Sequence, residues 1–141
     1  MLFRSIIDST VICAFLEEKY PGQSIYPAGK AEKGLCLMLE DWADEVLNLP
    51  VRTIRWGQSP EAREEAKKGL EAHLSTLDQF FVEGEFVFGA MTLADIAIFT
   101  QLHYLYTAAG HEVPSGFKNL HGWMALMQKS LKLASLQDLA A

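Results

Sequence analysis

The segment 93–106 constrains the fold of this chain more than any other, because it is apolar on nearly every side. A helix of that kind is stable when other helices enclose it. Directly before it, Thr92 and Asp95 stand in an acidic variant of the capping box, in which Asp95 accepts a hydrogen bond from the amide of Thr92. The sequence therefore predicts a buried central helix, with Thr92 and Asp95 as structural capping residues at its start.

Amphipathic segments that could enclose this helix precede and follow it. Apolar residues recur every three or four positions over 30–49, over 59–82 and, more briefly, over 120–127. A further helix is predicted over 8–20, with Asp8 or Ser9 at its start and Pro21 at its end. Residues 21–29, 83–89 and 110–116 are rich in turn-forming residues, which predicts loops.

Three short segments are less clear from the pattern. Pro50 should kink or end the helix over 30–49, and residues 51–57 could then continue as a helix or form a loop. Residues 133–139 have the spacing of a weaker helical tail, and 2–7 is the single candidate strand. The sum of these patterns favours an all-α helical bundle.

Composition excludes several classes of protein. The 141 residues suit about one domain, and half of them are hydrophobic, which is enough for a buried core. A formal net charge of -6 disfavours a nucleic acid partner. No apolar run approaches the ~20 residues needed to cross a membrane. The amino terminus leaves no room for a secretory segment, so a cytoplasmic location is expected.

Three segments near the amino terminus form a recognisable pattern, namely Ile7-Asp8-Ser9-Thr10-Val11-Ile12, Phe15-Leu16-Glu17-Glu18-Lys19-Tyr20-Pro21 and Ile25-Tyr26-Pro27. They resemble the last helix and the interdomain linker of the glutathione S-transferases. The family's buried central helix and the helix after it are similar to Gly89 with Thr92-Leu93-Ala94-Asp95-Ile96-Ala97, and to Asn119-Leu120 with Trp123. The resemblance implies a glutathione S-transferase C-terminal-like helical bundle over 29–141, preceded over 1–28 by the last helix of a thioredoxin-like domain and a linker.

The resemblance also implies candidate contacts with glutathione. Asp8 and Ser9 match the pair of an acidic residue and a serine that binds the γ-glutamyl end of the tripeptide. The alternative is that both residues only cap their helix. The thioredoxin-like unit that carries the family's activating Tyr, Ser or Cys has no counterpart in this sequence, so no catalytic residue is assigned and enzymatic activity stays open. No cofactor is expected, and glutathione remains a possible ligand.

Other residues suggest an apolar ligand pocket and argue against a metal site. Trp42 and Tyr104 are candidates to line such a pocket, and the alternative is that both belong to the core. Cys13 and Cys36 lack a CxxC partner and are expected to pack as small apolar residues. The four histidines, at 73, 103, 111 and 121, have no zinc-binding spacing, so no metal ion is expected.

Two functional hypotheses follow. The first is a non-catalytic helical module that acts by protein association or by holding a small apolar ligand. It predicts a homodimer with Val11, Ile12, Phe15 and the helix over 30–49 near the contact, because a face that the family covers with a sheet would be exposed. The alternative is the C-terminal part of an active transferase that conjugates glutathione to electrophiles.

Overall fold

The computed structural model describes residues 6–20, 22, 24–82 and 85–133, and this part of the chain is helical without any strand. The predicted all-α class is therefore confirmed. Most of the candidate strand and of the candidate helical tail lies outside the described residues. The elements are α1 (Ser9–Lys19), α2 (Lys30–Trp42), the π-helical turn η1 (Ala43–Leu47), α3 (Asn48–Trp56), α4 (Pro60–Phe80), α5 (Leu93–Ala109) and α6 (Lys118–Leu131).

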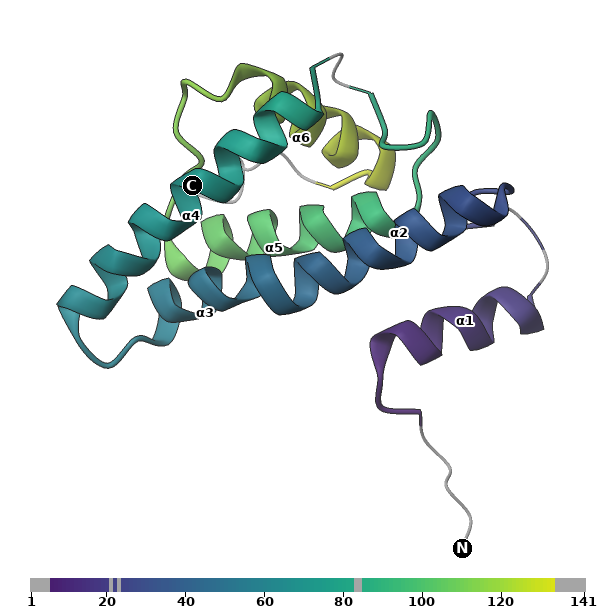
Figure 1. The fold of residues 1–141 in the computed structure, drawn as a ribbon, viewed down its shortest axis with the longest axis horizontal. Coiled ribbons are helices and arrows are strands. Elements are labelled where there is room, and N and C mark those ends of the chain that lie inside the picture. Colours follow the sequence, from purple (N-terminus) through teal and green to yellow (C-terminus); the bar gives the residue numbers. More distant parts are fainter. Residues whose placement is uncertain (1–5, 21, 23, 83–84, 134–141) are drawn as a thin grey trace, which may run out of the picture.

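Helix α5 lies at the centre of the bundle (Figure 1). It contacts α2, η1, α3 and α6, while α4 packs on α3 and on α6. Leu102 and Leu105 of α5 and Trp123 of α6 are completely buried. Burial of side chains of this size contributes roughly 1.5–3 kcal/mol each, so α5 supplies much of the core's stability. Helix α1 lies to one side, below α2 in the view of Figure 1.

The chain passes Pro50 without leaving the helix. Proline lacks an amide hydrogen, and its ring clashes with the carbonyl group four residues earlier in a regular α-helix. Just before Pro50 the backbone widens into η1, where the amide of Asn48 donates to the carbonyl oxygen of Ala43. A π-turn is one way in which a helix accommodates such a disruption. The helix then continues as α3 up to Trp56, so residues 51–56 are helical and do not form a loop.

One buried carboxylate joins three parts of the bundle. Asp95 is fully buried, and its Oδ2 accepts hydrogen bonds from the amide and the hydroxyl of Thr92, each at 2.9 Å. Its Oδ1 accepts from the amide of Val87 at 3.0 Å and from the indole N–H of Trp123 at 3.2 Å. Asp95 therefore fixes the start of α5, the loop before it and helix α6 relative to one another.

A second carboxylate positions the start of α6. Asp78 of α4 accepts a hydrogen bond from the amide of Leu120 at 3.0 Å, and its backbone oxygen accepts one from the side-chain amide of Asn119, also at 3.0 Å. The amides in the first turn of a helix have no partner within that helix. The carboxylate of Asp78 supplies a partner for the amide of Leu120, and this hydrogen bond connects α6 to α4.

Replacing Asp95 should destabilise the whole domain. Asp95→Asn keeps the volume but turns a hydrogen-bond donor toward the donors that surround the carboxylate. We expect the free energy of unfolding, measured with urea, to fall by about 2–4 kcal/mol. Asp41→Asn on the exposed side of α2 is the matched control and should change it by less than about 0.5 kcal/mol. Equal losses in the two variants would contradict the role assigned to Asp95.

Candidate functional site

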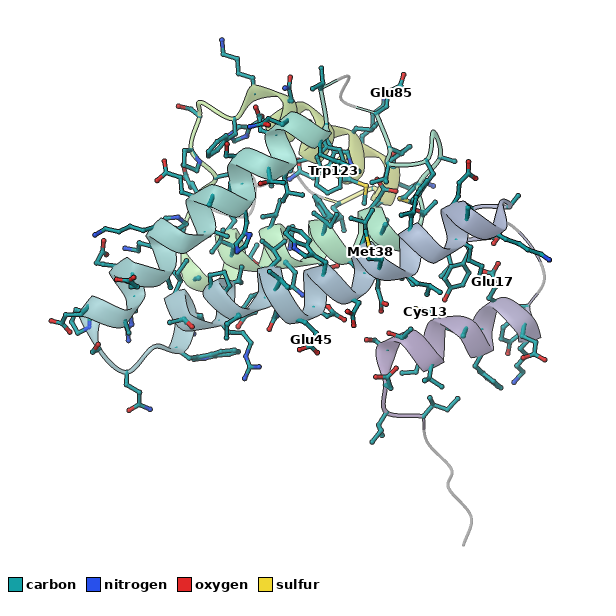
Figure 2. All side chains as sticks on the ribbon, viewed as in Figure 1. Cys13, Glu17, Met38, Glu45, Glu85 and Trp123 are labelled. Carbon is teal, nitrogen blue, oxygen red and sulfur yellow. The ribbon has the colours of Figure 1, made fainter. Side chains whose placement is uncertain are left out.

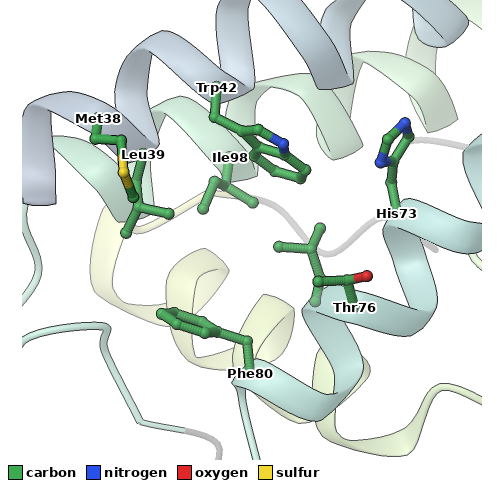
Figure 3. A pocket seen from close by; sticks show the side chains of 8 residues that line it. Met38, Leu39, Trp42, His73, Thr76, Phe80 and Ile98 are labelled. Atoms are coloured by element: carbon green, nitrogen blue, oxygen red, sulfur yellow. The ribbon is translucent and has the colours of Figure 1, made fainter.

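A cavity of about 350 Å³ lies between α2 and α4. Helix α4 packs against α3 near its own start and then diverges from α2, so the two helices form opposite walls (Figure 1). Ile98 of α5 also lines the space. The lining residues are Met38, Leu39 and Trp42 of α2, and His73, Thr76, Leu77 and Phe80 of α4, together with Ile98 (Figure 3).

The walls of this cavity are almost entirely apolar. Trp42 and His73 face each other edge to face, with ring centroids 5.7 Å apart and planes at 78°. The hydroxyl of Thr76 donates to the carbonyl oxygen of Ala72 at 3.0 Å, which satisfies its hydrogen within α4. Met38 and Phe80 are each about half exposed, so large apolar side chains stand in contact with solvent at the site. The arrangement suits a ligand with little charge.

The start of α1 has the geometry of a helix cap. Asp8 accepts a hydrogen bond from the amide of Val11 at 2.9 Å, and both Asp8 and Ser9 are exposed. Capping by an aspartate side chain satisfies one of the free amides of the first turn. The exposed position also leaves this end of α1 accessible to a ligand. The geometry of Asp8 and Ser9 is therefore compatible with helix capping and with contact to glutathione.

Hydrogen bonds to two carboxylates attach α1 to the rest of the chain. The hydroxyl of Thr10 donates to the buried Glu40 of α2. Glu17 of α1 accepts from the hydroxyl of Ser24 and from the amide of Ile25, the latter at 3.3 Å. Figure 2 shows Cys13 and Glu17 on the side of α1 that faces α2. No residue of α1 is fully buried, so polar contacts carry much of this attachment.

Both cysteines are free and lie at the junction of α1 with the bundle. Cys36 is completely buried beside Tyr26 and Leu93, and Cys13 packs against the same cluster. Burial raises the pKa of the Cys13 thiol, and the nearby carboxylate of Glu40 raises it further. Because only the thiolate is a strong nucleophile, a raised pKa makes Cys13 a weak one at neutral pH.

The central and later helices match a known family. Residues 60–126, which run from the start of α4 into α6, match the family model of the glutathione S-transferase C-terminal domain. These residues are therefore similar to a glutathione S-transferase C-terminal domain. The resemblance read from Thr92 to Ala97 and from Asn119 to Trp123 is thereby confirmed. The division of the chain near residue 28 stays a prediction.

Two solved structures have a similar fold. The chain superposes on the beta-etherase LigF from Sphingobium sp. strain SYK-6 with a TM-score of 0.71 and 17% identity, over 95% of this chain and 72% of that one. It superposes on glutathione transferase Xi 1 from Trametes versicolor with a TM-score of 0.63 and 17% identity, over 88% of this chain and 45% of that one. At such identity the likeness shows the fold alone. No curated protein matches the sequence.

The structure separates the two aromatic residues expected to share a pocket. Trp42 lines the cavity, but Tyr104 does not, because it packs instead against Trp56 with ring centroids 5.9 Å apart. Sequence reasoning missed the wall that α4 provides. The sequence does contain a sign of this wall. Positions 73, 76 and 80 lie on one side of α4, next to the buried residues at 70, 74 and 77.

Over the residues that the structure describes, no three or more His, Cys, Asp or Glu side chains group closely enough to hold a metal ion. None of the helices described is long and apolar enough to cross a membrane.

Proposed function

We propose that this glutathione S-transferase C-terminal domain binds a small apolar molecule in the cavity between α2 and α4. The observation that carries the proposal is the cavity itself, since about 350 Å³ lies within the range of ligand sites, roughly 300–1,000 Å³. Trp42 and Phe80 provide large aromatic surfaces from opposite walls. Burial of an apolar ligand against these surfaces supplies the free energy of binding.

A second candidate function is conjugation of glutathione to an electrophile, with the sulfur activated by a thioredoxin-like unit. The exposed Asp8 and Ser9 at the start of α1 support this candidate, because they match the family's contacts with the γ-glutamyl end. The two solved structures with this fold support it as well, since they are named as a beta-etherase and a glutathione transferase. In such an enzyme the cavity would hold the electrophile.

We also propose that the domain forms a homodimer through α1. Val11, Phe15 and Leu16 are about half exposed on α1, and Leu35 is half exposed on α2. Exposed apolar side chains in such numbers favour association, because contact with a second surface removes them from water. We place this association in the cytoplasm, where a reducing environment suits two free cysteines.

Filling the cavity should block binding of an apolar probe. Thr76→Phe adds a ring at the wall, and we expect it to weaken the binding of naphthalene, followed by tryptophan fluorescence, by about tenfold or more. Thr107→Phe is the matched control, because Thr107 is an exposed threonine of α5 whose hydroxyl makes the same kind of bond, to His103 at 2.8 Å. Failure of the wild type to bind naphthalene, or equal weakening by both variants, would contradict the proposal.

Asp8→Asn separates capping from glutathione binding. Asparagine caps a helix as well as aspartate, so the free energy of unfolding should change by less than about 0.5 kcal/mol. If the carboxylate binds the ammonium group of the γ-glutamyl end, the variant should bind glutathione at least about fivefold more weakly, as seen in the amide NMR shifts of residues 9–11. Wild-type shifts that do not change in millimolar glutathione would remove the support that Asp8 gives to the second candidate.

A charge on the exposed side of α1 should prevent association. We expect the wild type to sediment as a dimer at micromolar concentration and Phe15→Glu to sediment as a monomer, because the contact would have to bury an unpaired carboxylate. Val82→Glu, at an exposed apolar position after α4, is the control and should remain a dimer. A monomeric wild type would rule out the proposed homodimer.

A further inference from the structure

We infer that the ligand of the cavity between α2 and α4 is an uncharged two-ring aromatic molecule with one hydrogen-bonding group that contacts His73. This inference rests on the proposed function, because it names the class of molecule that the same cavity would bind. It follows from the charge of the walls, the size of the cavity and the position of its polar groups.

The charge of the lining disfavours ionic ligands. None of the lining residues is a carboxylate, lysine or arginine, and His73 is the one side chain of the set that can carry a charge. An ion that leaves water for such a site loses its hydration, and no carboxylate, lysine or arginine of the lining compensates for that loss. A neutral molecule does not incur this cost, so the walls select against carboxylates and amines alike.

The size of the cavity suits two rings. A protein cavity of about 150 Å³ holds a single benzene ring. The cavity between α2 and α4 has about 350 Å³, somewhat more than twice that space. Its walls come from two opposite helices, with Trp42 on one and Phe80 on the other, and a flat molecule can lie between them and touch both (Figure 3).

The polar groups of the lining lie toward one end of the cavity. In Figure 3 the nitrogen-bearing rings of Trp42 and His73 lie near each other, whereas Met38 and Phe80 lie away from them. Thr76 already donates its hydroxyl hydrogen to Ala72. The groups left to recognise a ligand atom are therefore the imidazole of His73, which can donate or accept, and the indole N–H of Trp42. A ligand with one hydroxyl group at the end of a flat apolar body matches this distribution.

Three probes of nearly the same shape test the inference. Naphthalene has the rings alone, 2-naphthol adds a neutral hydroxyl group, and 2-naphthoate adds a negative charge. By titration of the whole chain at pH 7, we expect 2-naphthol to bind about two- to tenfold more tightly than naphthalene, the gain typical of one hydrogen bond. We expect 2-naphthoate to bind most weakly.

His73→Phe identifies the group responsible. The variant keeps an aromatic ring against Trp42, so naphthalene should bind as it does to the wild type, while the preference for 2-naphthol disappears. His103→Phe, on α5 and outside the lining, is the matched control and should retain the preference. Thermal unfolding of each variant checks that the fold is kept.

The outcomes separate this inference from the proposed function. If naphthalene binds but 2-naphthol binds no better, if His73→Phe retains the preference, or if 2-naphthoate binds most tightly, the inference is overturned and the proposed function stands. If naphthalene does not bind the wild type, the proposed function itself fails, and the inference fails with it.

Discussion

The buried carboxylate of Asp95 is the constraint on which the arrangement of the helices depends. A carboxylate without access to water must have its oxygens hydrogen-bonded, and here donors from the start of α5, from the preceding loop and from α6 do so. Since these donors come from separate parts of the chain, satisfying Asp95 fixes α5 and α6 relative to each other. Helix α4 packs against both α3 and α6, and this leaves it apart from α2 where the cavity opens.

The sequence predicts the features of this domain that depend on neighbours along the chain. The pairing of Thr92 with Asp95 spans three residues, and the apolar stripes of the long helices repeat every three or four, so both can be read from spacing. The bond from Trp123 to Asp95 spans 28 residues, and no local pattern indicates it. Pro50 signals a disturbance in its helix, but the spacing does not reveal that a π-turn accommodates it.

The same distinction explains what could be predicted of the candidate site. The spacing of apolar residues in its helix predicts that Trp42 faces inward. The pattern of one helix does not indicate which other helix packs against that face. It meets α4, so His73 and Phe80 complete the cavity, and Tyr104 packs elsewhere with Trp56. The completed walls favour binding of a neutral molecule. The thiol of Cys13, whose pKa is raised by burial, lies elsewhere, at the junction of α1 with the bundle.

The attachment of α1 by hydrogen bonds to Glu40 and Glu17 has a consequence for how the molecule opens. Segments with few buried side chains detach at a lower free energy than the core. Helix α1 can therefore separate while α5 and its neighbours remain folded, and its departure would expose Tyr26 and Cys36. A partner that bound Val11 and Phe15 together with α2 would stabilise the attached position of α1. Binding of that partner would therefore reduce local unfolding at the amino-terminal end.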